Sequence, residues 1–335
     1  MKTLFGLLAL LLLSVTSVPS FATETKELVV YSARNEQLIK PMFEAYTKET
    51  GVKIRYITDK AGPLLQRLKA EGDNTKADLL ITVDAGNLWH AANEGMLEPL
   101  SSKILTANIP SALRDPENRW FGLSKRCRTI VYSTERVDPA SLSTYEALGN
   151  AQWQGRLLLR TSKKVYNQSL VAMLIAEHGE PDAETIVRSW VANLAAAPFS
   201  NDTKAMEAIL AGQGDVAVVN TYYFGRLQEK NPNLKLALFW PNQQSSGVHI
   251  NVSGAGVIKG SHNKQEATSF LEWLSSPKAQ NLFADANLEY PVNPGVQPND
   301  QVAAWGTFKG SDINLAKAGE LQSAAIKLMD RAGYR

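Results

Sequence analysis

The chain has 335 residues, a formal net charge of +2 and one cysteine, Cys127. A charge this close to zero argues against a nucleic-acid-binding protein, and a lone cysteine cannot form an internal disulfide. The length exceeds what one hydrophobic core usually fills, so we expect two domains. Cys127 stands between two arginines and is either a thiol of lowered pKa or a small buried residue in a strand.

The first 22 residues have the pattern of a secretory signal peptide. Lys2 is followed by an apolar run from Leu4 to Leu13 and by small residues that end at Ala22. Such a run is too short to span a bilayer permanently, and the remaining sequence has no apolar stretch of membrane length. We therefore expect cleavage after Ala22, export to the periplasm and no stable membrane insertion. Loss of Lys2 brings the net charge of the mature chain to +1.

The mature sequence alternates strand patterns with helix patterns. A strand followed or preceded by a helix is predicted in 27–51, 52–72, 77–97, 156–179, 204–230 and 251–277. This alternation predicts an α/β fold with mostly parallel sheets. No linker interrupts it, so the chain is expected to cross between two lobes on strands 126–133 and 251–258. The predicted lobes are 23–127 plus 252–300, and 128–251 plus 301–335.

Polar residues gather where the predicted strands end. In open α/β sheets, ligands bind beyond the carboxyl ends of the strands, where helices present their N-termini. The residues at these ends include arginine, one carboxylate and several phenols: Ala33–Asn35, Asp84, Gly86, Ser162–Tyr166 and Asn220–Tyr223. We therefore expect a ligand cleft lined by these side chains.

Two adjacent tyrosines, Tyr222 and Tyr223, follow a short apolar run. In the first turn of a helix, neighbouring side chains diverge by only about 100°, so both phenols can reach one point, with Asn220 or Thr221 as the helix cap. Tyr166 also begins a helix after a strand. A phenol has a pKa near 10, so it ligates at neutral pH only to a strongly cationic partner, such as Fe(III). The spacing alone leaves open simple packing, or a sugar or aromatic ligand stacked on the rings.

Six segments resemble one known family, the periplasmic ferric-ion-binding proteins, which are the solute-binding components of iron ABC importers. The segments are 30–54, 77–97, 166–179, 220–227 (NTYYFGRL), 248–263 and 289–296 (EYPVNPGV). The resemblance implies a type II periplasmic binding protein, with two α/β domains and the ligand in the interdomain cleft. It also implies that Tyr166, Tyr222 and Tyr223 ligate Fe(III), which the protein delivers to an inner-membrane permease without turnover.

The loop after the first strand departs from this family. Many relatives carry a histidine there, whereas this chain has Asn35 and Glu36. The resemblance therefore implies the branch that uses three tyrosines and a small anion such as carbonate. Glu36 either coordinates the metal or stands as a solvated glutamate at a helix start.

Arginines near the cleft are candidates for binding the anion, because a guanidinium grips a planar oxyanion with two hydrogen bonds. We expect this role first for Arg34, next for Arg128 and least for Arg126, although period two places Arg126 and Arg128 on one face of a strand. Asp84 is expected to cap the helix that follows it, with hydrogen bonding to a ligand-bound water as the alternative.

Two rival functions remain open at this point. A binding protein for an organic or oxyanion solute would use the arginines rather than the tyrosines. A periplasmic enzyme would need a nucleophile and base, for which we find no convincing motif. The four histidines show no metal-binding spacing and are expected to be structural or exposed: His90, His178, His249 and His262. We expect a monomer.

Overall fold

The computed structural model describes residues 26–335, so the predicted signal peptide and its cleavage site lie outside the described residues. The strands follow one path, β2-β1-β3-β8-β4-β6-β5, and β7 and β9 also pair with β4. Their bounds are β1 Glu27–Ser32, β2 Lys53–Thr58, β3 Leu79–Val83, β4 Phe121–Ser133, β5 Leu157–Leu158, β6 Val216–Asn220, β7 Leu236–Phe239, β8 Ile250–Val257 and β9 Tyr290–Pro291.

The sheet is mixed, and the expectation of mostly parallel pairing was wrong. At the two ends of the path the pairing is parallel, between β1 and both β2 and β3, and between β5 and β6. In the middle, β8 and β4 run antiparallel to their neighbours. The alternation of strand and helix predicted the parallel ends, but the direction of β8 depends on a return of the chain from far along the sequence.

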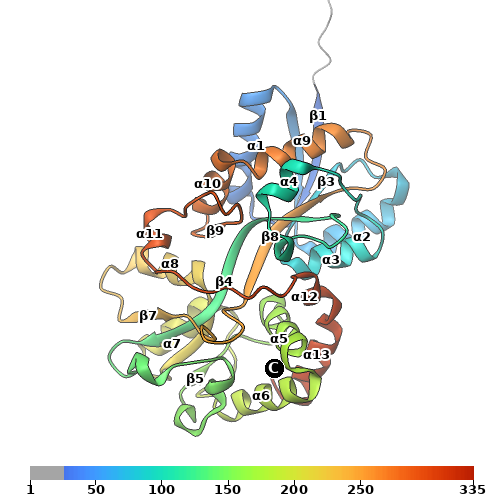
Figure 1. Cartoon of the computed structure of the whole chain (residues 1–335). Helices are drawn as coiled ribbons and strands as arrows, with labels where there is room; N and C mark the ends of the chain where they lie inside the picture. Colours follow the sequence, from blue (N-terminus) through green and yellow to red (C-terminus); the bar gives the residue numbers. More distant parts are fainter. Residues whose placement is uncertain (1–25) are drawn as a thin grey trace, which may run out of the picture.

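The long strand β4 belongs to both lobes. Residues from Phe121 to Cys127 pair with β8, and residues from Arg128 to Tyr132 pair with β6. In Figure 1, β4 runs from the upper group of elements into the lower one. The change of partner lies between Cys127 and Arg128, and the predicted lobe boundaries stay a prediction.

Helices cover both parts of the sheet (Figure 1). The first lobe carries α1 Glu36–Thr50, α2 Ala61–Glu71, α3 Ala85–Asn93, α4 Lys103–Asn108, α9 Lys264–Leu274 and α10 Pro277–Asp285. The second carries α5 Val165–His178, α6 Glu180–Ala192, α7 Asp202–Leu210, α8 Thr221–Lys230 and α13 Gln322–Arg331. The short helices α11 Asp300–Ala303 and α12 Ala316–Glu320 lie on the return from the first lobe to the second.

The spacing of the apolar residues along α1 gives its buried face. Ile39, Met42, Phe43 and Tyr46 are buried there, and Gly51 ends the helix with a φ of +78°. A left-handed glycine is the usual way to terminate a helix. This part of the fold therefore follows from local sequence alone.

The helix α12 packs against one helix of each lobe, α3 and α5. A side chain at Gly319 would bring a Cβ within 2.5 Å of the Cβ of Trp89, so only glycine allows this approach. Cys127 is fully buried in β4, and burial raises the pKa of its thiol, which favours the interpretation as a small core residue.

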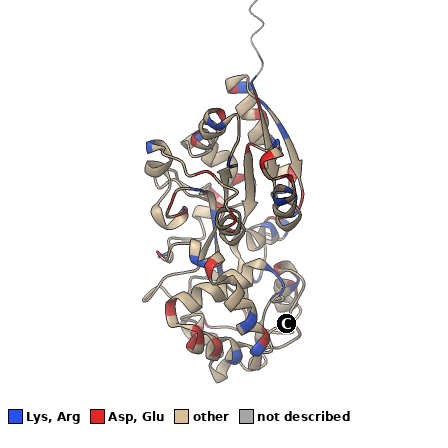
Figure 2. Ribbon diagram, turned by 90° about the vertical axis from the view of Figure 1, so that its right-hand side faces the viewer, with Lys and Arg blue, Asp and Glu red and all other residues tan. Residues whose placement is uncertain are grey.

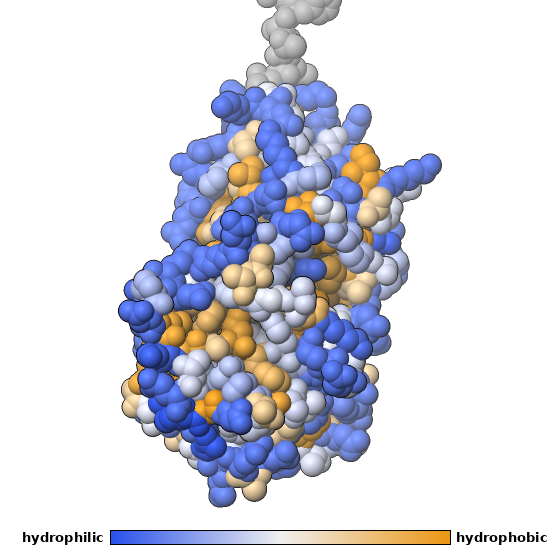
Figure 3. Space-filling view, turned by 60° about the vertical axis from the view of Figure 1, so that its left-hand side comes forward, coloured by the Kyte–Doolittle hydropathy of each residue, from blue (hydrophilic) through white to orange (hydrophobic). Residues whose placement is uncertain are grey.

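In the ribbon of Figure 2, basic and acidic residues are interspersed over both lobes. The face drawn in Figure 3 is largely hydrophilic, with apolar residues in scattered patches. Between residues 26 and 335, no helix combines the length and the apolar character that a membrane span requires.

Candidate metal centre

A cavity of about 120 Å³ lies where the two lobes meet. Its polar lining comes from both lobes: Arg34, Asn35, Arg126, Ser253, Asn287 and Glu289 on one side, and Tyr166, Tyr222, Tyr223 and Arg226 on the other. A larger hollow of about 400 Å³ lies on the outer side of the first lobe, but its polar side chains are exposed or half-buried. The interlobe cavity, which has buried polar groups, is therefore the candidate site.

The three tyrosines converge on this cavity as the sequence predicts. Because α8 begins directly after β6, Tyr222 and Tyr223 lie in its first turn, with ring centroids 4.5 Å apart. Tyr166 lies in the first turn of α5 and lines the same cavity as Tyr222 and Tyr223. Three phenol oxygens thus face one small space.

Asn220 occupies the N-cap position of α8, but its side chain does not cap the helix. Its amide oxygen accepts from Arg128 at 3.1 Å, and its Nδ2 donates to the Tyr222 hydroxyl at 3.3 Å. The Tyr223 hydroxyl accepts from Nη1 of Arg160 at 3.4 Å. Both contacts are long, so neither phenol oxygen is firmly held.

Burial keeps the phenols of Tyr166 and Tyr222 protonated in the absence of a cation. Desolvation is the main cause that raises the pKa of both groups, and the nearby phenol of Tyr223 raises both further. The guanidinium of Arg126 acts in the opposite direction on both groups. A strongly charged cation is therefore needed to displace the phenol protons.

Arg34 is buried in the wall of the first lobe, and most of its hydrogen-bonding capacity is used there. Its Nη1 donates to Ser253 Oγ at 3.0 Å and to Glu289 Oε2 at 3.1 Å, and its Nη2 donates to Phe283 O at 3.3 Å. The guanidinium also lies over the Phe283 ring, 4.2 Å from its centroid. Only Nε of Arg34 has no partner among the described residues.

Arg126 differs from Arg34, because neither of its terminal nitrogens has a hydrogen-bond partner in the described part of the chain. The residue is 2% exposed and lines the cavity. Its Nη2 lies 3.8 Å from Oδ2 of Asp84, and its guanidinium carbon lies 5.7 Å from the centroid of the Tyr166 ring. An unpartnered buried guanidinium is a ready site for an anion.

Arg128 is not among the residues that line the cavity, so its role in anion binding stays a prediction without support from this geometry. Its guanidinium donates to Asn167 Oδ1 at 2.8 Å, Asp202 Oδ2 at 3.1 Å and Val218 O at 3.0 Å. Arg126 and Arg128 share a strand face, but β4 passes from one lobe to the other between them. Arg126 therefore reaches the cleft, while Arg128 ties β4 to β6, α5 and α7 inside the second lobe.

The first-loop residues have separate places. Asn35 lines the cavity, whereas Glu36 does not, and Glu36 accepts a hydrogen bond from the Tyr56 hydroxyl at 2.8 Å at the start of α1. Asp84 caps α3 by accepting from Gly86 N at 2.8 Å, as predicted. Among the cavity residues that the sequence analysis missed, Arg226 lies one helical turn after Tyr222, a spacing that could have indicated it.

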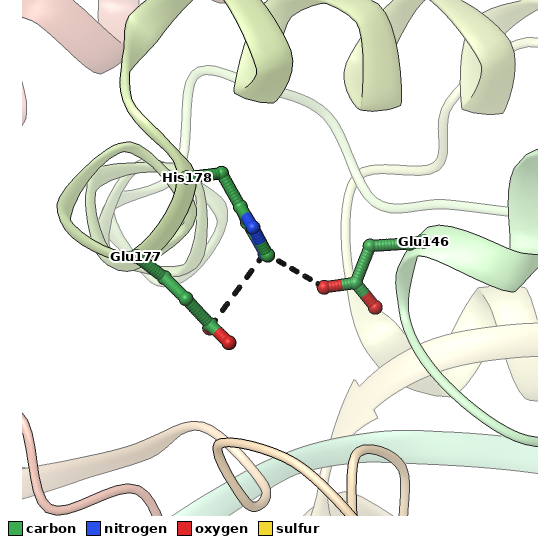
Figure 4. Close-up of side chains that lie close together, drawn as sticks. All are labelled: Glu146, Glu177 and His178. Atoms are coloured by element: carbon green, nitrogen blue, oxygen red, sulfur yellow. Dashed lines mark hydrogen bonds and ion pairs between the residues drawn. The ribbon is translucent and has the colours of Figure 1, made fainter.

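The histidines lie away from this cavity. His90 contacts Gln322 at 2.6 Å, His262 is exposed, and burial lowers the pKa of His249 to about 3. His178 lies near two carboxylates, which the sequence spacing did not indicate. Its Nε2 is 2.8 Å from Oε1 of Glu146 and 3.8 Å from Oε2 of Glu177 (Figure 4). The Glu146 carboxylate also accepts from Asn242, so these contacts serve to fasten the end of α5.

The comparisons with known proteins identify the family. A family model described as bacterial extracellular solute-binding protein matches residues 41–310. The chain belongs to this family. Iron uptake protein A1 of Synechocystis sp. is 42% identical over 318 residues, which cover 93% of this chain and 88% of that protein.

Solved structures of other solute-binding proteins share the fold. Trichodesmium IdiA (FutA), in complex with iron and citrate ligands, is 43% identical with a TM-score of 0.89, and the match covers 92% of this chain and 100% of that one. Ferric iron-binding protein A of Mannheimia haemolytica, in an open conformation, is 34% identical with a TM-score of 0.86, covering 92% and 99%. The predicted resemblance and the two-domain fold of a type II periplasmic binding protein are confirmed.

Proposed function

We propose that this solute-binding protein captures Fe(III) in the interlobe cavity and delivers it to an ABC permease in the inner membrane. The observation that carries the proposal is the convergence of Tyr166, Tyr222 and Tyr223 on one small cavity between the lobes. Three phenolates neutralise the charge of Fe(III), and hard oxygen donors suit this ion. The protein acts by coordination, without turnover, as a monomer in the periplasm after cleavage behind Ala22.

A small anion such as carbonate completes the iron shell. Arg126 is its anchor in this proposal, because its two terminal nitrogens are unpartnered among the described residues and lie at the cavity. Arg34 adds a fixed positive charge and its one unbonded nitrogen, Nε. Arg128 contributes indirectly, by holding the segments that carry the tyrosines.

The division of groups between the lobes supports an order of events. All three phenols come from α5 and α8 of the second lobe, whereas Arg34, Asn35 and Glu289 come from the first. Iron can therefore bind the tyrosine wall while the lobes are apart, and the facing wall then closes over it by hinge bending.

The experiment that tests the function is a titration of the purified protein with Fe(III) and bicarbonate at neutral pH. We expect a visible phenolate-to-iron charge-transfer absorption that saturates at one iron per chain. Tyr222→Phe should lose or shift this band, and the matched control Tyr132→Phe should keep it, because Tyr132 lies on β4 outside the cavity. A colourless parent protein would exclude the iron site.

The rival function is capture of an organic or oxyanion solute by the cavity arginines. The observation that favours it is the same unpartnered guanidinium of Arg126. Tight binding of phosphate or of an organic acid by a protein that stays colourless with Fe(III) would select this rival.

A further inference from the structure

The carboxylate of Asp84 is buried directly behind Arg126. Asp84 is fully buried, and its hydrogen bonds all come from neutral groups: Gly86 N at 2.8 Å, Asn251 Nδ2 at 2.9 Å, and Ser169 Oγ at 3.0 Å from each oxygen. Among residues 26–335, Arg126 is the one basic side chain within 4.0 Å of this carboxylate. The two charges therefore depend on each other.

The other carboxylate near Arg126, that of Glu289, is already paired with Arg34. Glu289 accepts from Arg34 at 3.1 Å, and it also accepts from Ser124 and from Asn287. Arg34 and Glu289 thus form a hydrogen-bonded ion pair in the cavity wall. Asp84 is left as the nearest compensating charge for Arg126, at 3.8 Å and without a direct hydrogen bond between them.

We propose that Asp84 is the resident counter-charge of Arg126 and sets how weakly the cavity binds anions when iron is absent. This inference rests on the proposed anion site at Arg126. A carboxylate close behind the guanidinium cancels much of its attraction for an anion in front. Fe(III) then supplies the positive charge that restores this attraction, so anion and metal bind together rather than separately. Asp84 is a positioning and specificity residue that touches neither.

The ionisation of Asp84 supports this role. Burial raises the pKa of Asp84 to about 6, and the Arg126 guanidinium opposes that rise. The carboxylate is therefore mostly charged at pH 7.5 and mostly neutral at pH 5. The groups around it from α3, α5 and β8 are Gly86, Ser169 and Asn251, none of which titrates.

Two other buried groups near Arg126 do not titrate in this window. Burial, together with the charges of Arg128 and Arg126, lowers the pKa of His249 to about 3. For Glu289, burial raises the pKa, but Arg34 and Arg126 lower it further, so that it lies below its usual range. A change in anion affinity between pH 7.5 and 5 therefore reports on Asp84.

The test measures sulfate binding to the iron-free mature protein by calorimetry at pH 7.5. Sulfate is the probe because its charge stays constant from pH 5 to 8. Asp84→Asn keeps the size and the helix-capping ability of the side chain but removes its charge. We expect sulfate to bind the variant about tenfold more tightly than the parent, from one unit charge removed at short range.

The matched control is Asp78→Asn. Asp78 is also buried in the first lobe and accepts hydrogen bonds from Val29 N and Ser261, but no basic side chain in the described chain pairs with it. This variant should bind sulfate as the parent does. Combining Asp84→Asn with Arg126→Gln should abolish the gain, because the anchor is then missing.

Three results would overturn the inference: sulfate affinities of the parent and Asp84→Asn within about twofold, an equal gain in Asp78→Asn, or a gain that survives removal of Arg126. If Asp84→Asn does not fold, the sulfate affinity of the parent protein is measured at pH 7.5 and at pH 5 instead. It should rise several-fold at the lower pH, and an unchanged affinity contradicts the proposal. The iron colour titration is separate, so failure of the metal site and failure of the Asp84 role give different results.

Discussion

The two walls of the cavity hold their polar groups in different ways. On the tyrosine side, the Tyr222 and Tyr223 hydroxyls have only long contacts, of 3.3 and 3.4 Å. On the facing side, Arg34 makes three hydrogen bonds and pairs with the buried Glu289. Loosely held groups can exchange a partner for a ligand, whereas a bonded buried ion pair cannot do so without leaving a charge unpaired. The second lobe is therefore expected to supply the ligands, and the first to supply shape and charge.

The largest effect is expected on the loosely held wall. Tyr222→Phe or Tyr223→Phe removes one ligand oxygen but leaves the ring packing in place. Iron affinity should fall at least about a thousandfold, roughly 4 kcal/mol. Competition against a chelator of known affinity measures this loss, with Tyr132→Phe as the control. A phenylalanine variant that binds iron within about tenfold of the parent would show that its phenol is not a ligand.

Arg128 provides the next largest effect, on stability rather than on binding. Arg128→Gln removes the arginine that donates to the fully buried Asp202 at 3.1 Å and leaves Arg160, at 3.5 Å, as its remaining basic partner. Breaking a buried pair completely costs about 3–5 kcal/mol, so with Arg160 in place the melting temperature should fall by less than that full cost implies. The protein that remains folded should still show the dependence of iron binding on bicarbonate. A stable variant that has lost this dependence would restore Arg128 as the anion anchor.

Arg126 and Arg34 lie on the same wall, that of the first lobe, but they are held differently: Arg34 is hydrogen-bonded and the terminal nitrogens of Arg126 are not. Arg126→Gln removes a guanidinium whose terminal nitrogens make no hydrogen bond among the described residues, so iron affinity should fall about thirtyfold, ~2 kcal/mol, and should no longer respond to bicarbonate. Arg34→Gln should lower thermal stability, because Glu289 loses its partner, but should keep the bicarbonate response. Titrations of both variants at several bicarbonate concentrations decide the matter. If only Arg34→Gln loses the response, the original ranking of the arginines was right.

The sequence predicted what is set locally. Tyr166, Tyr222 and Tyr223 each follow a strand and begin a helix, and that arrangement is enough to place three phenols at one edge of the sheet. The different places of Arg126 and Arg128 could not be predicted in this way, because the two residues share a strand face and only the point where β4 leaves the first lobe distinguishes them. Glu289 reaches the cavity through the return of the chain after β8, a contact over 255 residues with Arg34 that no local pattern encodes.

The smallest effect is expected in the loop after β1. Asn35 lines the cavity, but its neutral side chain is a weak ligand for a hard trivalent ion, and Glu36 points to Tyr56 instead. We expect Asn35→Ala and Glu36→Gln each to change iron affinity by less than about threefold. With no strong ligand on the first lobe, iron favours the closed state only through the anion and the arginines, because a ligand shifts a conformational equilibrium only by its differential affinity. Iron-loaded protein should then remain partly open, which small-angle scattering of loaded and iron-free samples can measure. A loss of affinity above about a hundredfold in Glu36→Gln would make the first loop a true ligand and the two walls chemically alike.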